Sequence, residues 1–250
     1  MINAQLHQRP VAADRNEHRA TRMKVPLTDW RVASKLNSLF LAAVEFGDAA
    51  RDFPIVFVRA GQKPDGTMIV APIAVMGITK DQNLYVDDQG GWRASYIPAL
   101  LNCYPFCIGP MDEKHFAVCF DAAWSGVGTE GERLFDDAGE PARLLTEATQ
   151  QMERLQGESE RTRVMCERLV AADLLRDMRF DAQLPDGNKL TVDGFMTVDA
   201  EKLNQAPADT VLDMHRSGLL GMIHAHHVSL GHMRRLLDWH LERAAATPKG

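Results

Sequence analysis

The spacing of apolar residues changes in the middle of the chain, and this change limits the possible folds more than any other feature. From residue 53 to residue 121, short apolar runs alternate with turn signals, which is typical of strands. From residue 141 to residue 246, apolar residues recur at three- and four-residue spacing, which is typical of helices. We therefore expect an α+β protein.

The first half is expected to form a small, mostly antiparallel β-sheet. Residues 55–60 (IVFVRA) are rich in β-branched and aromatic side chains, and Asp65-Gly66 is a strong turn signal. Residues 68–78 (MIVAPIAVMGI) are apolar throughout, which predicts a strand buried on both faces. Residues 39–53 have a helical pattern instead, and that helix is expected to end before Pro54.

The second half is expected to be helical, with one β-hairpin, and to pack on the sheet. A helix beginning near Pro141 should end close to Gly157, and a second helical segment should follow it. The pattern then alternates around Asp186-Gly187, which is the strongest hairpin signal in the chain. Since no linker separates the two halves, residues 38–246 are expected to form one domain. Residues 1–37 are expected to be disordered or loosely ordered.

Composition excludes several classes of protein. A chain of 250 residues, 45% of them apolar, can bury a sizeable core without needing disulfide bonds or structural metals to fold. Its 28 basic and 34 acidic residues give a net charge of −6, which argues against a general nucleic-acid binder. No apolar run is long enough to span a membrane, and the first 24 residues lack the apolar run of a secretory signal peptide. We therefore expect a cytoplasmic location.

Two motifs resemble known sites but lack their context. Gly126, Gly128 and Gly131 match the pattern G-x-G-x-x-G, yet Pro141 and the acidic residues before it leave no room for the helix that a dinucleotide site needs. We interpret this segment as a glycine-rich surface loop. Cys103 and Cys107 are spaced C-x₃-C, and their apolar flanks indicate buried thiols rather than a redox pair.

Six of the nine histidines lie between residues 215 and 240. On a helical wheel His226 lies on the apolar stripe with Leu219 and Ile223, which favours a buried, hydrogen-bonded histidine over a metal ligand. His224 and His227 are three residues apart on the adjacent flank and could hold two corners of an iron or zinc site. A third ligand at motif spacing is not evident in the sequence, so both interpretations stay open.

Aromatic residues and prolines are concentrated between residues 92 and 106. A packed corner, in which rings cover a sheet edge and prolines hold the turns, is the more common role for such residues. The alternative is an aromatic-walled groove for an extended peptide. The candidate binding residues on that interpretation are Trp92, Tyr96, Pro98, Tyr104, Pro105 and Phe106.

This segment, including Trp92, and others along the chain resemble the SapC family. The resemblance covers roughly residues 38–240 in unbroken order and depends on that order rather than on any one motif. It is carried by Phe53-Pro54-Ile55-Val56-Phe57, Ala74-Val75-Met76-Gly77, Asn83-Leu84-Tyr85-Val86-Asp87, Tyr96-Ile97-Pro98-Ala99, Tyr104-Pro105-Phe106, Leu134-Phe135-Asp136, Gly139-Glu140-Pro141, Gly194-Phe195, Val198-Asp199, Glu201-Lys202-Leu203, Gly218-Leu219-Leu220, Ala225-His226 and Ser229-Leu230. Two departures are Asn102-Cys103, where the family tends to have a basic pair, and His227, where it usually has an apolar residue.

The resemblance implies an association with surface-layer (S-layer) gene clusters, but no established reaction and no catalytic residues. The leading hypothesis is a non-enzymatic accessory protein, without a cofactor, that binds a peptide or protein partner through the aromatic-proline surface. The alternative is a metal- or cofactor-dependent peptide-modifying enzyme that uses iron or zinc at His224, His226 and His227. A homodimer through the last helix, with Met222, Met233 and Trp239 in the contact, is a further option.

Overall fold

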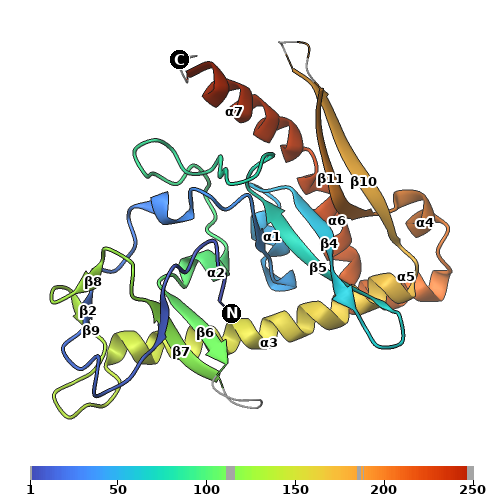
Figure 1. Cartoon of the computed structure of the whole chain (residues 1–250). Coiled ribbons are helices and arrows are strands. Elements are labelled where there is room, and N and C mark those ends of the chain that lie inside the picture. The colour runs from blue at the N-terminus through green and yellow to red at the C-terminus, as the bar shows by residue number, and fades with distance from the viewer. Residues whose placement is uncertain (1, 111–115, 185–186, 188, 247–250) are drawn as a thin grey trace. The chain divides into compact units, whose positions relative to one another are not determined.

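The computed structural model describes residues 2–110, 116–184, 187 and 189–246. The chain divides into two compact units, the first made of residues 1–36, 86–93 and 99–157 and the second of residues 37–85, 94–98 and 158–250. Antiparallel sheets dominate the N-terminal half and helices the C-terminal half, which confirms the α+β class (Figure 1). Both units include residues of the range 38–246, and the single domain expected there stays a prediction.

The first unit contains two three-stranded antiparallel sheets, with strand orders β1-β7-β6 and β8-β2-β9. The strands of the first sheet are β1 (Pro10–Ala12), β6 (Phe106–Pro110) and β7 (Phe116–Asp121). Those of the second sheet are β2 (Arg22–Met23), β8 (Val127–Gly128) and β9 (Glu132–Arg133). Two short helical segments accompany them, η1 (Trp30–Ala33) and α2 (Ala99–Asn102).

The N-terminal segment is an integral part of this unit, contrary to the expected loose order. β1 pairs with β7, and the carboxylate of Asp121 at the end of β7 holds the residues before β1. Asp121 is 1% exposed and accepts hydrogen bonds from the main-chain N–H groups of Gln8 (3.1 Å) and Arg9 (2.8 Å) and from the Tyr104 hydroxyl (3.0 Å). Burial alone would raise the pKa of this carboxyl, but these bonds together lower it.

The glycine-rich segment is an exposed loop at residues 129–131, as expected, and short strands flank it on both sides. Val127–Gly128 and Glu132–Arg133 pair with opposite edges of β2. Gly131 has a φ of +100°, and a Cβ atom there would lie 2.1 Å from the Met23 carbonyl oxygen. The glycine is therefore required by close approach of two backbones.

The second unit is built on a five-stranded antiparallel sheet with the order β10-β11-β4-β5-β3. Its strands are β3 (Ser38–Phe40), β4 (Ile55–Gln62), β5 (Met68–Val75), β10 (Leu175–Gln183) and β11 (Lys189–Val198). β10 and β11 form the predicted hairpin, although Asp186 itself lies outside the described residues. The helices of this unit are η2 (Ala43–Glu45), α1 (Phe46–Ala49), α4 (Ala200–Asn204), α5 (Ala208–Arg216), α6 (Leu219–Ser229) and α7 (His232–Ala246).

Two helix boundaries differ from the sequence prediction. The helix α3 (Arg143–Ala171) runs without interruption through Gly157, where a break was expected, and contributes residues to both units. Residues 39–53 were expected to be helical, but β3 begins before them and only η2 and α1 are helical. In the described part of the chain, the helices are all too short or too polar to cross a membrane.

The anchoring role of Asp121 predicts a large loss of stability when its carboxylate is removed. Asp121→Ala leaves two main-chain N–H groups and the Tyr104 hydroxyl without their acceptor, so we expect unfolding to become easier by about 3 kcal/mol. Asp137→Ala removes a carboxylate that is 96% exposed, and should change stability by less than about 0.5 kcal/mol. Urea unfolding of both variants measures the difference, and equal effects would contradict this role.

Candidate functional site

The joint between β4 and β11 is short, and a histidine from α6 extends it. Only Phe195 with Val58 and Met196 with Phe57 are in register between these strands. Beyond them, the imidazole of His226 lies between the two chains. Its Nδ1 is 2.7 Å from the Ile55 carbonyl oxygen, and its Nε2 is 3.1 Å from the Val198 main-chain nitrogen. The ring thus links strand ends that do not pair directly.

These partners determine the protonation state of His226. A carbonyl oxygen can only accept a hydrogen bond, so Nδ1 carries the proton that points to Ile55. A main-chain N–H can only donate, so Nε2 is the acceptor for Val198, and the Thr197 hydroxyl donates to the same nitrogen over 2.8 Å. His226 is therefore neutral in the folded protein, with its hydrogen on Nδ1.

Burial reinforces this neutral state. His226 is 0% exposed, and its ring lies edge-on to Phe57 with 5.1 Å between the ring centres. Desolvation lowers the pKa of His226 to about 4, against the opposing effect of its bond to the Ile55 carbonyl, and the neighbouring His227 lowers it further. An imidazole with this pKa is uncharged at neutral pH.

Neighbouring residues of α6 complete the joint. The Ser229 hydroxyl accepts the Ile55 N–H at 2.9 Å and donates to the His226 carbonyl at 2.6 Å. The Nε2 atom of His227 lies 2.8 Å from the Val198 carbonyl oxygen and donates to it. Three side chains from one turn of α6 thus satisfy the N–H and C=O groups of both Ile55 and Val198. Such satisfaction is required of buried main-chain groups.

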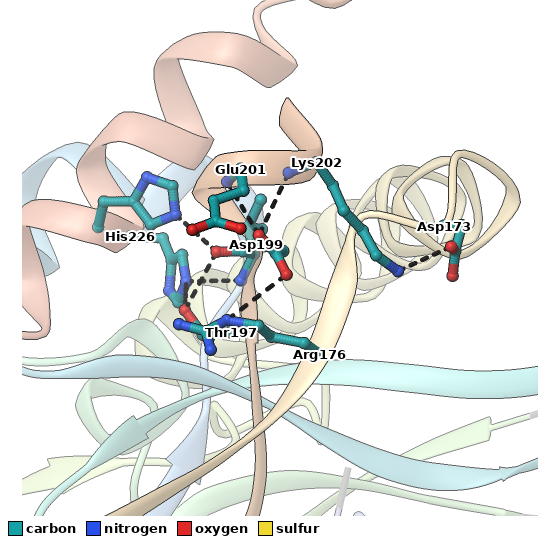
Figure 2. Close-up of polar contacts among 9 residues, drawn as sticks. Asp173, Arg176, Thr197, Asp199, Glu201, Lys202 and His226 are labelled. Carbon is teal, nitrogen blue, oxygen red and sulfur yellow. Dashed lines mark hydrogen bonds and ion pairs between the residues drawn. The ribbon is translucent and has the colours of Figure 1, made fainter. Parts of the chain in front are cut away.

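Figure 2 shows the polar residues around the end of β11. Asp199 caps α4 by accepting the main-chain N–H groups of Glu201 (2.9 Å) and Lys202 (3.2 Å). These bonds, that from Lys202 foremost, lower the pKa of Asp199. The Arg176 Nε atom on β10 lies 3.8 Å from the same carboxylate, which ties the base of the hairpin to α4.

A small open cavity of about 380 Å³ lies beside this cluster, next to Lys202 and Asp173. The two side chains form an ion pair of 2.7 Å, and Lys202 is 41% and Asp173 87% exposed. Because the pair is exposed and already neutralised, it contributes little to stability. It also offers no uncompensated charge for a ligand.

A second cavity, of about 410 Å³, lies between the distal part of β10 and α7. Its apolar lining comes from Phe180, Ala182 and Leu184 on one side and from Leu237 and Leu241 of α7 on the other. All five side chains are partly exposed. We name this cavity the β10–α7 groove.

Charged residues border the β10–α7 groove. Arg234 and Asp238 form a weak ion pair of 3.5 Å and are 80% and 53% exposed, and Asp181 lies on the β10 side. β10 is also the last strand of its sheet. An apolar groove beside a free strand edge is a feature of peptide-binding proteins.

The six candidate residues of the aromatic-proline segment do not belong to one unit. Tyr96 and Pro98 lie in the second unit and the other four in the first. Pro98, Tyr104, Pro105 and Phe106 are buried, whereas Trp92 and Tyr96 are partly exposed.

Local contacts explain how these aromatic side chains pack. The Tyr104 ring lies 5.9 Å from Trp124 and stacks on His7 at 5.8 Å. Trp92 packs on Trp30 at 5.4 Å, and the Tyr96 hydroxyl donates to Glu45 at 2.8 Å. These contacts favour the packed-corner interpretation for the buried members of the set.

The candidate metal ligands are placed differently from one another. His224 is exposed, whereas His226 is buried and both of its ring nitrogens are hydrogen-bonded within the protein. Within the described ranges, no group of three or more His, Cys, Asp or Glu side chains is placed to hold a metal ion. The metal centre remains a prediction.

Other sequence predictions can be compared with burial. His226 lies in the interior and is hydrogen-bonded, as its place on the apolar stripe of the helix predicted. All four cysteines are buried free thiols, and burial raises the pKa of Cys107 to about 12. Met233 is 3% exposed, so it is not the exposed contact residue that the dimer option required. The roles of Thr197 and Ser229 had no sequence signal beyond their closeness to apolar runs.

The double role of Ser229 predicts that Ser229→Ala destabilises the protein. The substitution leaves the buried Ile55 N–H without an acceptor, which costs about 2 kcal/mol. Ser217→Ala is the matched control, because the Ser217 hydroxyl is exposed and bonds only to main-chain carbonyls of its own helix. Urea unfolding should show an effect on Ser229→Ala alone, and a comparable effect of the control would refute the joint's importance.

Comparison with known proteins gives one match. A family model described as SapC matches residues 14–236, which covers most of the 250-residue chain. Neither a protein with a curated description nor a solved structure matches the chain. The matched range includes β4, β11 and α6, whose residues form the joint. On this evidence, the chain belongs to the SapC family.

Proposed function

We propose that this protein is a non-enzymatic accessory protein that binds an extended apolar segment of a partner protein. The β10–α7 groove is the observation that carries this proposal. Its volume of about 410 Å³ falls in the range of sites that bind small ligands or a few side chains.

The chemistry of the groove indicates the kind of segment it would take. Phe180 and Ala182 of β10, with Leu184 directly after the strand, present one apolar face, and Leu237 and Leu241 of α7 present the other. A segment in extended conformation places its side chains at the same two-residue spacing. Its main chain could then pair with the free edge of β10, the mode known as strand addition.

The aromatic-proline surface contributes to this proposal only through Trp92 and Tyr96. These two side chains are partly exposed, while Pro98, Tyr104, Pro105 and Phe106 are buried. Buried residues support a contact surface by holding its shape and not by touching a partner. The groove is therefore the better candidate for the contact surface.

Selection from a library of short random peptides displayed on phage tests the proposal. We expect enrichment of peptides with apolar residues at every second position. Leu237→Arg should weaken their binding about tenfold or more, because it places a charge in the apolar lining. Val228→Arg on α6 is the control, since Val228 is 74% exposed and outside the groove.

Three outcomes of the selection would count against the proposal. Equal loss of binding in both variants, or binding unaffected by Leu237→Arg, would place the contact elsewhere. Failure to enrich any peptide, with light scattering showing a stable dimer, would identify a second copy as the occupant. Circular dichroism melting of each variant establishes that it is folded.

Metal analysis of the untagged protein tests the alternative of a metal-dependent peptide-modifying enzyme. We expect no stoichiometric iron or zinc, because the acceptor nitrogen of His226 is taken by Val198 and Thr197. Stoichiometric metal that is lost in a His224→Ala, His227→Ala double variant would contradict this expectation and favour the enzyme.

A further inference from the structure

We propose that His226 makes the β4–β11 joint an acid-sensitive latch, which holds the β10–β11 hairpin at neutral pH and releases it when the imidazole gains a proton. Release of the hairpin would deform the β10 wall of the groove, so this part of the inference rests on the proposed function. The latch itself depends only on the geometry of the joint.

The joint has few contacts besides those of α6. Two residue pairs join β11 to β4, whereas eight pairs in register join β11 to β10. The hairpin is therefore bound more firmly within itself than to the rest of its sheet. Loss of the bonds from His226 would leave the short ladder and the bonds of Ser229 and His227 to hold it.

Protonation of His226 removes the acceptor on which Val198 depends. A hydrogen on Nε2 would point at the N–H of Val198, which can only donate, so two donors would face each other at 3.1 Å. The Thr197 hydroxyl can turn to accept the new hydrogen, because a hydroxyl both donates and accepts. The buried Val198 N–H still loses its acceptor, and that loss destabilises the closed joint.

Among the described residues, the partners of the His226 ring nitrogens are Ile55, Thr197 and Val198, and none of them is a carboxylate. On its own helix His226 has His227 as a neighbour, with 5.2 Å between ring centres, and that residue lowers the pKa of His226. From β4 the ring meets Ile55 and Phe57, which carry no side-chain charge.

The charged groups at the end of β11 are Asp199, Arg176 of β10 and, in the first turn of α4, Glu201 (Figure 2). The Asp199 carboxylate caps α4 and contacts Arg176 of β10 at 3.8 Å. Figure 2 shows these groups around Thr197 and His226. The buried imidazolium would therefore lack a counter-ion, and buried charges without a partner are strongly destabilising.

The direction of the pH effect follows from linkage. Histidine titrates near pH 6.5 when it is exposed, and the closed joint lowers the pKa of His226 to about 4. The open state therefore binds more protons between these values, and the joint loses stability as the pH falls below 6.5. At pH 5 the shift corresponds to a decrease of roughly thirtyfold in the closed-to-open ratio.

Hydrogen exchange measured by mass spectrometry at pH 7.5 and pH 5 tests the latch. After correction for the intrinsic exchange rate, we expect the protection of residues 195–198, the part of β11 that pairs with β4 or bonds to His226, to fall by roughly thirtyfold at pH 5. The part of α3 in the first unit, residues 143–157, is the internal reference and should not change. Unchanged protection of residues 195–198 in the wild-type protein would overturn the proposal.

Two variants separate titration from packing. His226→Gln retains a donor and an acceptor but binds no proton near pH 5, so its protection should be the same at both pH values. His226→Phe removes both bonds, so residues 195–198 should exchange quickly even at pH 7.5. If His226→Gln shows the same acid-dependent loss as the wild type, another group is responsible and the proposal fails.

An NMR titration of the His226 ring decides the question, together with the wild-type exchange result, if His226→Gln does not fold. A measured pKa near 6.5 for His226 would refute the latch.

Binding of a selected peptide at the two pH values tests the link to the groove. We expect the wild-type protein to release the peptide at pH 5 and His226→Gln to retain it. An acid-dependent hairpin in a protein that selects no peptide would refute the proposed function and leave the latch standing. If the wild-type protein retains the peptide at pH 5 although the hairpin has opened, opening of the latch does not control binding in the groove, and that part of the proposal is refuted.

Discussion

A single buried imidazole holds together strand ends that the sheet itself does not pair. His226 gives a hydrogen to Ile55 and receives one from Val198, so it acts in place of a missing rung between β4 and β11. A main chain could not supply this rung, because the two strands are in register at only two positions. A side chain with one donor and one acceptor on opposite edges of a flat ring fits the space, and neutral histidine is the residue with that arrangement. On the latch proposal, the attachment of the hairpin to β4 depends on that ring remaining uncharged.

The joint also shows why α6 has its sequence. The helix is apolar around most of its surface, and its polar groups His226, His227 and Ser229 follow one another within a single turn. Each bonds to a main-chain group of β4 or β11. Unsatisfied main-chain groups are costly in a dry interior. The strand ends therefore need the polar side chains of α6 as hydrogen-bond partners, and these side chains need the strand ends. The hairpin that forms one wall of the β10–α7 groove is positioned by this arrangement, which links a packing constraint to the proposed contact surface.

Local features of the fold could be predicted from the sequence, and features that depend on distant contacts could not. The strand-rich half, the hairpin of β10 and β11 and the burial of His226 follow from apolar spacing and turn residues. The partners of His226 do not, since Ile55 is 171 residues away in the chain. The N-terminal segment was expected to be loose because its sequence is polar, but Asp121 holds it from 112 residues away. Gly157 suggested a helix break, yet α3 runs through it, because a single glycine costs a helix only about 1 kcal/mol.

The hydrogen position on His226 is the most direct test of this account, because every bond in the joint follows from it. A long-range proton–nitrogen NMR correlation on the folded protein at pH 7 distinguishes the two neutral tautomers and the cation. The account predicts a neutral ring with its hydrogen on Nδ1 and an Nδ1–H signal that exchanges slowly with water. A ring with its hydrogen on Nε2, or an imidazolium at pH 7, would contradict it.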